Sequence, residues 1–222
     1  MAATEEAQSV GKKILSIVNF VNHVIVLSVT GYILYLAGWE LNVTSVHAGL
    51  CTVGYVLLMS EGLMVLTSES PLSRQLKSYK TRSHVHWCLQ ILGASFSIAG
   101  TSILYLTKKT HFRSVHGILG ITSVAIMIFL GISGASVFYA YQLRKILKPV
   151  GTKAMHNFLG IACFIIGIVC QCYGYGKKWM TKKCGQDIAT LCIVLTAIST
   201  LICLYRPFVS LYRQVSTLLP RG

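Results

Sequence analysis

Charged residues are scarce in this 222-residue sequence and make up 12% of it. A water-soluble domain normally carries about 25% charged residues, so much of this chain has no water to face. Acidic residues are the scarcest, with six Asp and Glu against 20 Lys and Arg. The basic residues stand in short runs between apolar stretches, with no continuous basic face and no aromatic-plus-basic motif. This pattern argues against nucleic-acid binding and is typical of positions beside a membrane.

The sequence also lacks a disulfide framework, although it contains eight cysteines. All but Cys184 lie inside apolar runs, where a free thiol packs as a small hydrophobe. Cys170 and Cys172 are two residues apart, so on a helix they point in different directions and do not readily share a metal. We interpret the cysteines as packing residues.

Long apolar stretches dominate what is present. About 20 helical residues cross a hydrocarbon core of about 30 Å. Six stretches qualify: residues 14–36, 46–66, 86–106, 116–139, 156–175 and 188–205. We therefore expect an all-α integral membrane protein with a six-helix domain over residues 14–207. Residues 1–13 form an N-terminal segment and residues 208–222 a tail.

The distribution of Lys and Arg predicts the orientation. They are more frequent in the N-terminal segment, the second and fourth loops and the tail than in the other three loops. By the positive-inside rule both termini are cytoplasmic. Asn42-Val43-Thr44 is a glycosylation sequon in the first loop, which this topology places outside the cytosol. It lies close to the membrane, so it supports the topology only weakly.

Four histidines occupy equivalent positions: His47, His86, His116 and His156 each open an apolar helix. Because consecutive helices run in opposite directions, His47 and His116 lie at one depth, near the non-cytoplasmic face. His86 and His156 lie near the cytoplasmic face. Two histidines at one depth on neighbouring helices can ligate one haem iron from opposite sides. The pattern predicts a bundle of the four middle helices that encloses two b-type haems, stacked across the membrane.

Glycines follow each of these histidines on the same helical face. Gly54 and Gly93 come seven residues after their histidine, and Gly120 and Gly160 come four residues after theirs. A porphyrin that lies against a helix needs such missing side chains. The alternative is that these glycines serve helix packing alone, as small residues often do in membranes.

Histidines at both axial positions leave no open site for oxygen chemistry, so one-electron transfer is the expected function. Two rivals stay open at this point. One is a haem-free proton-coupled transporter or channel that uses the intramembrane histidines and Glu61 as a relay. The other is a structural membrane protein in which the polar residues are incidental.

Three histidines remain outside this scheme. His84 is about 200° around the helix from His86, so both cannot face one haem. His86 is the better ligand because it begins the apolar run and has Gln90 one turn further on. For His23 we expect a hydrogen bond to the backbone or to a neighbouring helix. His111 either lines a substrate site near the outer haem or is an ordinary loop residue.

Glu61 lies fourteen residues beyond His47, or about 21 Å along a helix, and so nearer the cytoplasmic haem. A carboxylate inside a membrane is costly and usually functional. It stays protonated, compensates a basic group near that haem, or snorkels to the cytosolic surface. We hypothesise that it influences the potential of one haem only.

The chain resembles the cytochrome b-561 family, which has six helices with a haem-binding histidine at the start of each of the four middle ones. The resemblance covers nearly the whole chain. It depends on Met59-Ser60-Glu61-Gly62-Leu63, Ser68-Glu69-Ser70, His86-Trp87 with Gln90, and His116-Gly117. One departure is Ala48, where many relatives have a proline after the histidine.

This resemblance implies an ascorbate-dependent transmembrane oxidoreductase. Cytosolic ascorbate would be the electron donor, and monodehydroascorbate radical or ferric iron the acceptor on the far side. It also implies a membrane of the endoplasmic reticulum or of cytoplasmic vesicles. Whether the chain forms a homodimer is left open.

Basic residues provide compatible entrances for anions, although they equally serve topology alone. The candidates for the cytosolic donor or the haem propionates are Lys77, Lys80, Arg82, Lys148 and Lys153. The candidates on the non-cytoplasmic side are Lys108, Lys109, His111, Arg113, Lys177 and Lys178.

Overall fold

The computed structural model describes residues 2–76 and 78–219, and within these ranges all regular structure is helical. The elements in order are α1 (Ala2–Gly38), α2 (Val43–Cys51), the π-helix η1 (Thr52–Met59), α3 (Ser60–Met64), α4 (Pro71–Gln75), α5 (Tyr79–Thr107), α6 (Val115–Phe138), α7 (Pro149–Tyr175) and α8 (Lys178–Leu218). The segments α2, η1 and α3 follow one another without a break and form one membrane-length helix.

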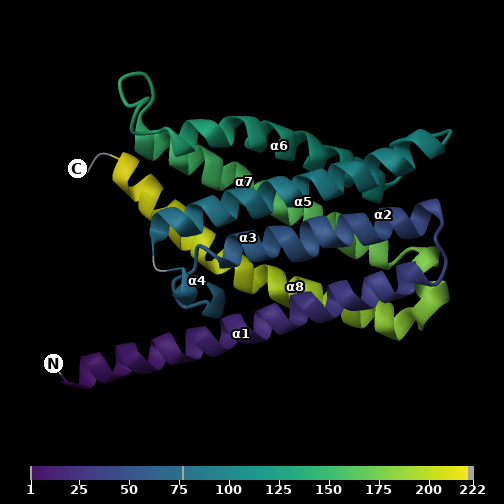
Figure 1. Ribbon diagram of the computed structural model, residues 1–222, viewed down its shortest axis with the longest axis horizontal. Helices are drawn as coiled ribbons and strands as arrows, with labels where there is room; N and C mark the ends of the chain where they lie inside the picture. Colours follow the sequence, from purple (N-terminus) through teal and green to yellow (C-terminus); the bar gives the residue numbers. More distant parts are fainter. Residues whose placement is uncertain (1, 77, 220–222) are drawn as a thin grey trace.

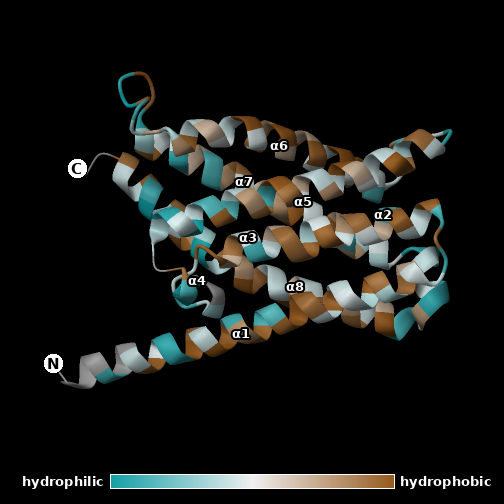
Figure 2. Cartoon of the chain, viewed as in Figure 1, coloured by the Kyte–Doolittle hydropathy of each residue, from teal (hydrophilic) through white to brown (hydrophobic). Residues whose placement is uncertain are grey.

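Among the described residues, six helices are long and apolar enough to cross a membrane: α1, the continuous α2–η1–α3, α5, α6, α7 and α8. Their surfaces are mostly hydrophobic, and polar residues collect in the connections, as Figure 2 shows for the link between α7 and α8. Helices suit the bilayer because they satisfy their backbone hydrogen bonds internally. The prediction of an all-α, multi-pass membrane protein is confirmed.

Local capping explains where these helices begin. The Asn42 side chain accepts hydrogen bonds from the backbone N–H groups of Thr44 and Ser45, each at 3.0 Å, and so caps α2. The asparagine of the sequon is therefore a helix cap. Ser114 caps α6 in the same way, by accepting from the N–H of Gly117.

Three of the four histidines do not open their helices, contrary to expectation. His116 is the second residue of α6, but His47 lies about one turn inside α2, and His86 and His156 lie about two turns inside α5 and α7. Ser78 starts α5 and Pro149 starts α7 earlier, because serine caps a first turn and proline fits its first position. The extra turns contain basic residues, Lys80 and Arg82 in α5 and Lys153 in α7, and so lie outside the apolar stretches that hydropathy identifies.

The outermost helices are also longer than their apolar stretches. α1 continues back to Ala2 through the expected N-terminal segment, and α8 continues to Leu218 through most of the expected tail. α8 is interrupted at Gly185, whose φ of 80° is a conformation that glycine adopts without strain. A short amphipathic turn thus precedes the membrane-length part of α8.

The helices form one bundle with two distinct ends (Figure 1). Both chain termini, the α6–α7 connection and the starts of α5 and α7 lie at one end, here called the termini end. The α1–α2, α5–α6 and α7–α8 connections lie at the other, here called the opposite end. The α2–η1–α3 segment, α5, α6 and α7 pack against one another as a four-helix bundle, and α1 and α8 pack beside it.

The π-helix places Tyr55 in the middle of this bundle. Tyr55 is 3% exposed, and its hydroxyl donates a hydrogen bond to Ser123 Oγ of α6 at 2.7 Å. Ser123 Oγ in turn donates to the carbonyl of Gly120 at 2.9 Å. π-helical segments are rare and often lie at functional sites. No signal in the sequence predicted this one.

Candidate functional site

His47 and His116 meet at the opposite end of the bundle. The centres of their imidazole rings are 6.0 Å apart and the ring planes are nearly perpendicular, at 88°. A metal about 2 Å from one nitrogen of each of two imidazoles holds the ring centres roughly 6 Å apart. The spacing of this pair therefore suits a single metal ion between the rings.

Hydrogen bonds fix the protonation of both rings. His47 Nδ1 lies 2.9 Å from the carbonyl oxygen of Gly100 in α5, and His116 Nδ1 lies 2.9 Å from that of Cys170 in α7. A carbonyl only accepts, so each Nδ1 carries its hydrogen and each Nε2 keeps a free lone pair. Metal-ligating histidines usually donate their second N–H in this way.

Two cysteine thiols lie against these histidines, which the sequence did not predict. Cys51 Sγ is 3.6 Å from His47 Nδ1, and Cys170 Sγ is 3.3 Å from His116 Nδ1. Cys51 follows His47 by one helical turn, a spacing that could have revealed the contact. Cys170 belongs to another helix, so its contact depends on packing alone. Both thiols are free.

His86 and His156 lie at the termini end. His86 Nδ1 donates to the carbonyl of Gly62 in α3 at 2.6 Å, which again leaves Nε2 free. Gln90, one turn on, donates to the carbonyl of Met59 at 3.2 Å and holds the same two helices together. His156 lies about two turns into α7, at the same end of the bundle.

His156 has a different environment from the other three. Its Nδ1 is buried and has no hydrogen-bond partner in the part of the chain that the structure describes. A cavity of about 320 Å³ lies beside it, between α6 and α7. The cavity is lined mainly by apolar side chains, among them Phe129, Met155 and Leu159. A buried polar atom without a partner beside an apolar cavity is a feature that a bound group would explain.

The four glycines that follow the histidines divide into two kinds. Gly54 and Gly93 face each other where η1 crosses α5, and a Cβ at Gly54 would lie 2.7 Å from the carbonyl oxygen of Gly93. They serve helix packing, so the expectation that they make room for a porphyrin was wrong. Gly120 and Gly160 face open space: a Cβ at Gly160 meets no atom within 4 Å, and one at Gly120 meets only Cys170 Sγ, at 3.6 Å.

These residues fit haem better than a bare metal ion. Within residues 2–76 and 78–219 no group of three or more histidine, cysteine or acidic side chains could hold a metal. Two imidazoles per site are instead what haem needs, because the porphyrin supplies the other ligands. Each pair joins a histidine of α2 or α5 to one of α6 or α7. Gly120 and Gly160 leave space on α6 and α7.

The basic candidates lie at the ends where they were expected. Lys80 and Arg82 are at the start of α5, and Lys148 and Lys153 flank the start of α7, both at the termini end. Lys77 lies outside the described residues. The three lysines are exposed, whereas Arg82 is half-buried and its Nε has no partner among the described residues.

The candidates at the opposite end occupy two connections: Lys108, Lys109, His111 and Arg113 between α5 and α6, and Lys177 and Lys178 at the start of α8. The His111 ring stacks on Tyr105, with ring centres 4.0 Å apart. This contact gives His111 a packing role in the connection. His84 lies edge-on to Phe138, with ring centres 5.0 Å apart, and does not face the His86 pair.

Glu61 has a partner that the sequence did not identify. Its Oε1 lies 2.7 Å from His23 Nδ1, and the side chains of His23 and Glu61 are only 15% and 16% exposed. His23 Nε2 lies 2.9 Å from Ser70 Oγ. The expected bond from His23 to a neighbouring helix is confirmed. A glutamate that snorkels to the surface would be more exposed than this one.

The sequence matches the protein family described as eukaryotic cytochrome b561 over residues 46–182. Transmembrane reductase CYB561D2 of Bos taurus is 28% identical over 184 residues, 79% of this chain and 82% of the bovine protein. The protein of the same name from Homo sapiens gives the same identity and coverage. Lysosomal membrane ascorbate-dependent ferrireductase CYB561A3 of Rattus norvegicus is 29% identical over 55% of this chain and 51% of its own length. No solved structure matches.

Proposed function

This chain belongs to the cytochrome b561 family, whose members bind haem b and transfer electrons across membranes, and we propose that ascorbate is its electron donor. The donor is cytosolic, and the acceptor is monodehydroascorbate radical or ferric iron on the lumenal or extracellular side. The rat relative is named an ascorbate-dependent ferrireductase, which supports this choice.

Four histidines would hold two haems in this chain. His47 and His116 would hold one at the opposite end, and His86 and His156 would hold the other at the termini end. The observation that carries the proposal is the 6.0 Å separation of the His47 and His116 rings, each with Nδ1 hydrogen-bonded to a backbone carbonyl. When bound, each haem supplies a one-electron carrier.

The protein positions the haem ligands and excludes water from the middle of the bundle. The carbonyls of Gly100, Cys170 and Gly62 orient three of the four imidazoles and make them stronger ligands. With two imidazoles as its protein ligands, each haem would serve electron transfer rather than oxygen binding. The buried ring of Tyr55 fills the middle of the bundle between the two pairs.

Charge at the termini end supports an anionic donor there. Lys80, Arg82, Lys148 and Lys153 bring positive charge from two connections to the end that carries His86 and His156. Such a cluster attracts ascorbate and neutralises propionates. In the proposed orientation both termini and this cluster are cytoplasmic.

One measurement tests this function directly. The protein is purified after expression with ample haem, and its absorbance is recorded before and after ascorbate addition, together with a haem assay. We expect a b-type spectrum that ascorbate reduces and two haems per chain. A colourless protein would favour the haem-free transporter, and a haem spectrum that ascorbate leaves oxidised would reject the donor.

A further inference from the structure

A second polar cluster lies outside the two histidine pairs, between α1, α3 and α8. Its centre is the contact between His23 of α1 and Glu61 of α3, here called the dyad. A carboxylate at 2.7 Å from an imidazole is a pair that readily holds one additional proton, shared between the two groups. The electron-transfer function proposed above does not use it.

The dyad lies directly behind one of the candidate haem ligands. Glu61 precedes Gly62, and the carbonyl of Gly62 accepts the Nδ1–H of His86 at 2.6 Å. The dyad and the His86 imidazole are thus connected through two adjacent residues of α3. Because charges interact strongly in a medium of low dielectric constant, a charge at the His86 site changes the electrostatic potential at the dyad.

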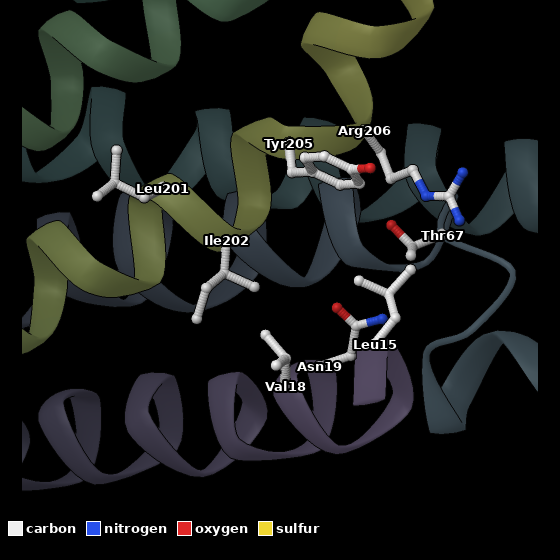
Figure 3. A pocket seen from close by; sticks show the side chains of 8 residues that line it. All are labelled: Leu15, Val18, Asn19, Thr67, Leu201, Ile202, Tyr205 and Arg206. Carbon is white, nitrogen blue, oxygen red and sulfur yellow. The ribbon is translucent and has the colours of Figure 1, made fainter. Parts of the chain in front are cut away.

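A cavity lies near the dyad, without His23 or Glu61 in its lining. It has a volume of about 280 Å³ and lies between α1, α8 and Thr67 (Figure 3). Asn19, which lines it, precedes His23 by one turn on the same face of α1. Thr67, on another wall, accepts the backbone N–H of Ser70, whose hydroxyl contacts His23.

The cavity has polar side chains at one end. Figure 3 shows the side chains of Asn19, Thr67 and Arg206 at one end, with Leu201 and Ile202 toward the other. Asn19 is 2% exposed, yet its Nδ2 has no hydrogen-bond partner among the described residues. Since a liquid water occupies about 30 Å³, the cavity has room for several. Arg206, whose side chain is 35% exposed, also lines the cavity.

The other titratable groups around the dyad already have salt-bridge or hydrogen-bond partners. Glu69 is paired with Arg206 at 2.6 Å, and Arg74 of α4 donates to the Glu69 carbonyl. From α8, Cys203 approaches Glu61 and accepts a hydrogen bond from Asn22 of α1. From α5, the groups that reach α3 are His86 and Gln90, which bond to backbone carbonyls. The dyad is thus the polar pair in this region that the proposed electron transfer leaves unused.

We infer that His23 and Glu61 form a proton-binding site that takes up a proton when an electron reaches the haem at His86 and His156. This inference rests on the proposed function. One electron arrives from the donor, and one proton passes from water at the termini end to the dyad. The added negative and positive charges cancel, so neither is left uncompensated inside the membrane. Ser70 holds the His23 ring in place by contacting Nε2.

The test is a redox titration of the purified holoprotein at several pH values, followed by absorbance. In the wild type we expect the midpoint potential of the termini-end haem to fall as pH rises. The limit for one proton per electron is about 59 mV per tenfold change in proton concentration. The potential of the other haem stays nearly constant with pH.

Three variants identify the proton site. Glu61→Gln and His23→Gln should each remove most of the pH dependence of that potential, and both keep a polar side chain of similar size. Glu69→Gln is the matched control, because it removes a nearby acid outside the dyad and should retain the dependence. If Glu61→Gln fails to bind haem, His23→Gln gives the same test. Proton uptake by the wild type on reduction, measured with a pH-indicating dye, needs no variant.

The outcomes separate this inference from the proposed function. Two intact haems with a pH-independent wild-type potential would overturn the inference and leave the function standing. So would a pH dependence that survives in both dyad variants. A protein without haem would overturn both. Loss of the dependence in the dyad variants, with retention in Glu69→Gln, would support it.

Discussion

The ring of Tyr55 occupies the space that a side chain at Gly167 would need. A Cβ built on Gly167 falls against the carbons of the phenol ring. Tyr55 belongs to the π-helix of the second span and Gly167 to α7, so the contact joins the two halves of the central bundle. It sets how closely these helices approach between the two histidine pairs.

Gly167→Ala should therefore lower the stability of the protein by about 1–3 kcal/mol, the usual cost of overpacking a filled core. Tyr55→Leu alone should also destabilise, because it leaves a cavity. The double variant should lose less stability than the two single variants together, since the smaller residue accommodates the new methyl group. Thermal unfolding in detergent measures all three. Strict additivity would contradict the contact.

Replacement of the histidines should remove haem in pairs. His47→Ala and His116→Ala should give one spectrum with one haem left, and His86→Ala and His156→Ala should give another. The reason is that each haem loses one axial ligand in either variant of its pair. Difference spectra and a haem assay check this, with His84→Ala as the control that keeps both haems. Variants that group His47 with His86 would refute the pairing.

Substitutions at two glycines should distinguish an effect on haem binding from an effect on folding. Gly160→Leu adds a side chain to open space, so we expect stable apoprotein with a lower haem content. Gly54→Ala forces a methyl group against the backbone of α5, so we expect a loss of about 1–3 kcal/mol of folding stability. Haem content and unfolding of the haem-free protein measure the two effects. Full haem content in Gly160→Leu would show that this glycine faces lipid instead.

The Glu69–Arg206 ion pair should make stability depend on acid pH. Burial alone raises the pKa of Glu69, but hydrogen bonds from Ser68 and the backbone and the charge of Arg206 outweigh it, so the pKa is lowered. A carboxyl with a lowered folded-state pKa stabilises the fold above its unfolded pKa, and this contribution disappears as pH falls through the folded value. We expect about 1 kcal/mol or less.

The ion pair is tested by unfolding temperatures measured from about pH 3 to about pH 6, a range that spans the ordinary glutamate pKa. Glu69→Gln should flatten the acid side of the wild-type curve. Glu40→Gln is the control, because the Glu40 carboxylate is 70% exposed and lies 3.8 Å from Lys183. If the curve of Glu69→Gln equals that of the wild type, the ion pair does not stabilise the fold.

The basic cluster at the termini end should set the apparent affinity for ascorbate. Lys148→Gln with Lys153→Gln should raise the ascorbate concentration needed for half-maximal haem reduction several-fold, because an anion loses an attractive field. The effect should shrink at high salt. Lys108→Gln with Lys109→Gln changes the same amount of charge at the opposite end and serves as the control. A larger effect in the control pair would reverse the proposed orientation.

Sequence reasoning succeeded where one periodic property decides the structure. Six apolar stretches gave six helices, because only long, internally bonded helices tolerate a bilayer interior. Since consecutive spans alternate in direction, the positions of His47, His86, His116 and His156 along the chain also determined which two lie at each end. No knowledge of packing was needed for that step.

Only the tertiary structure decided how each helix is rotated and what it touches. Gly54 and Gly160 look equivalent in sequence, yet one packs against a backbone and the other faces open space. The contact between His23 and Glu61 joins residues 38 positions apart, and the carbonyls that orient the imidazoles belong to other helices. Hydropathy fixes depth in the membrane but not rotation about the helix axis. Rotation is set by the fit of side chains between distant segments, and with it the chemistry at each face.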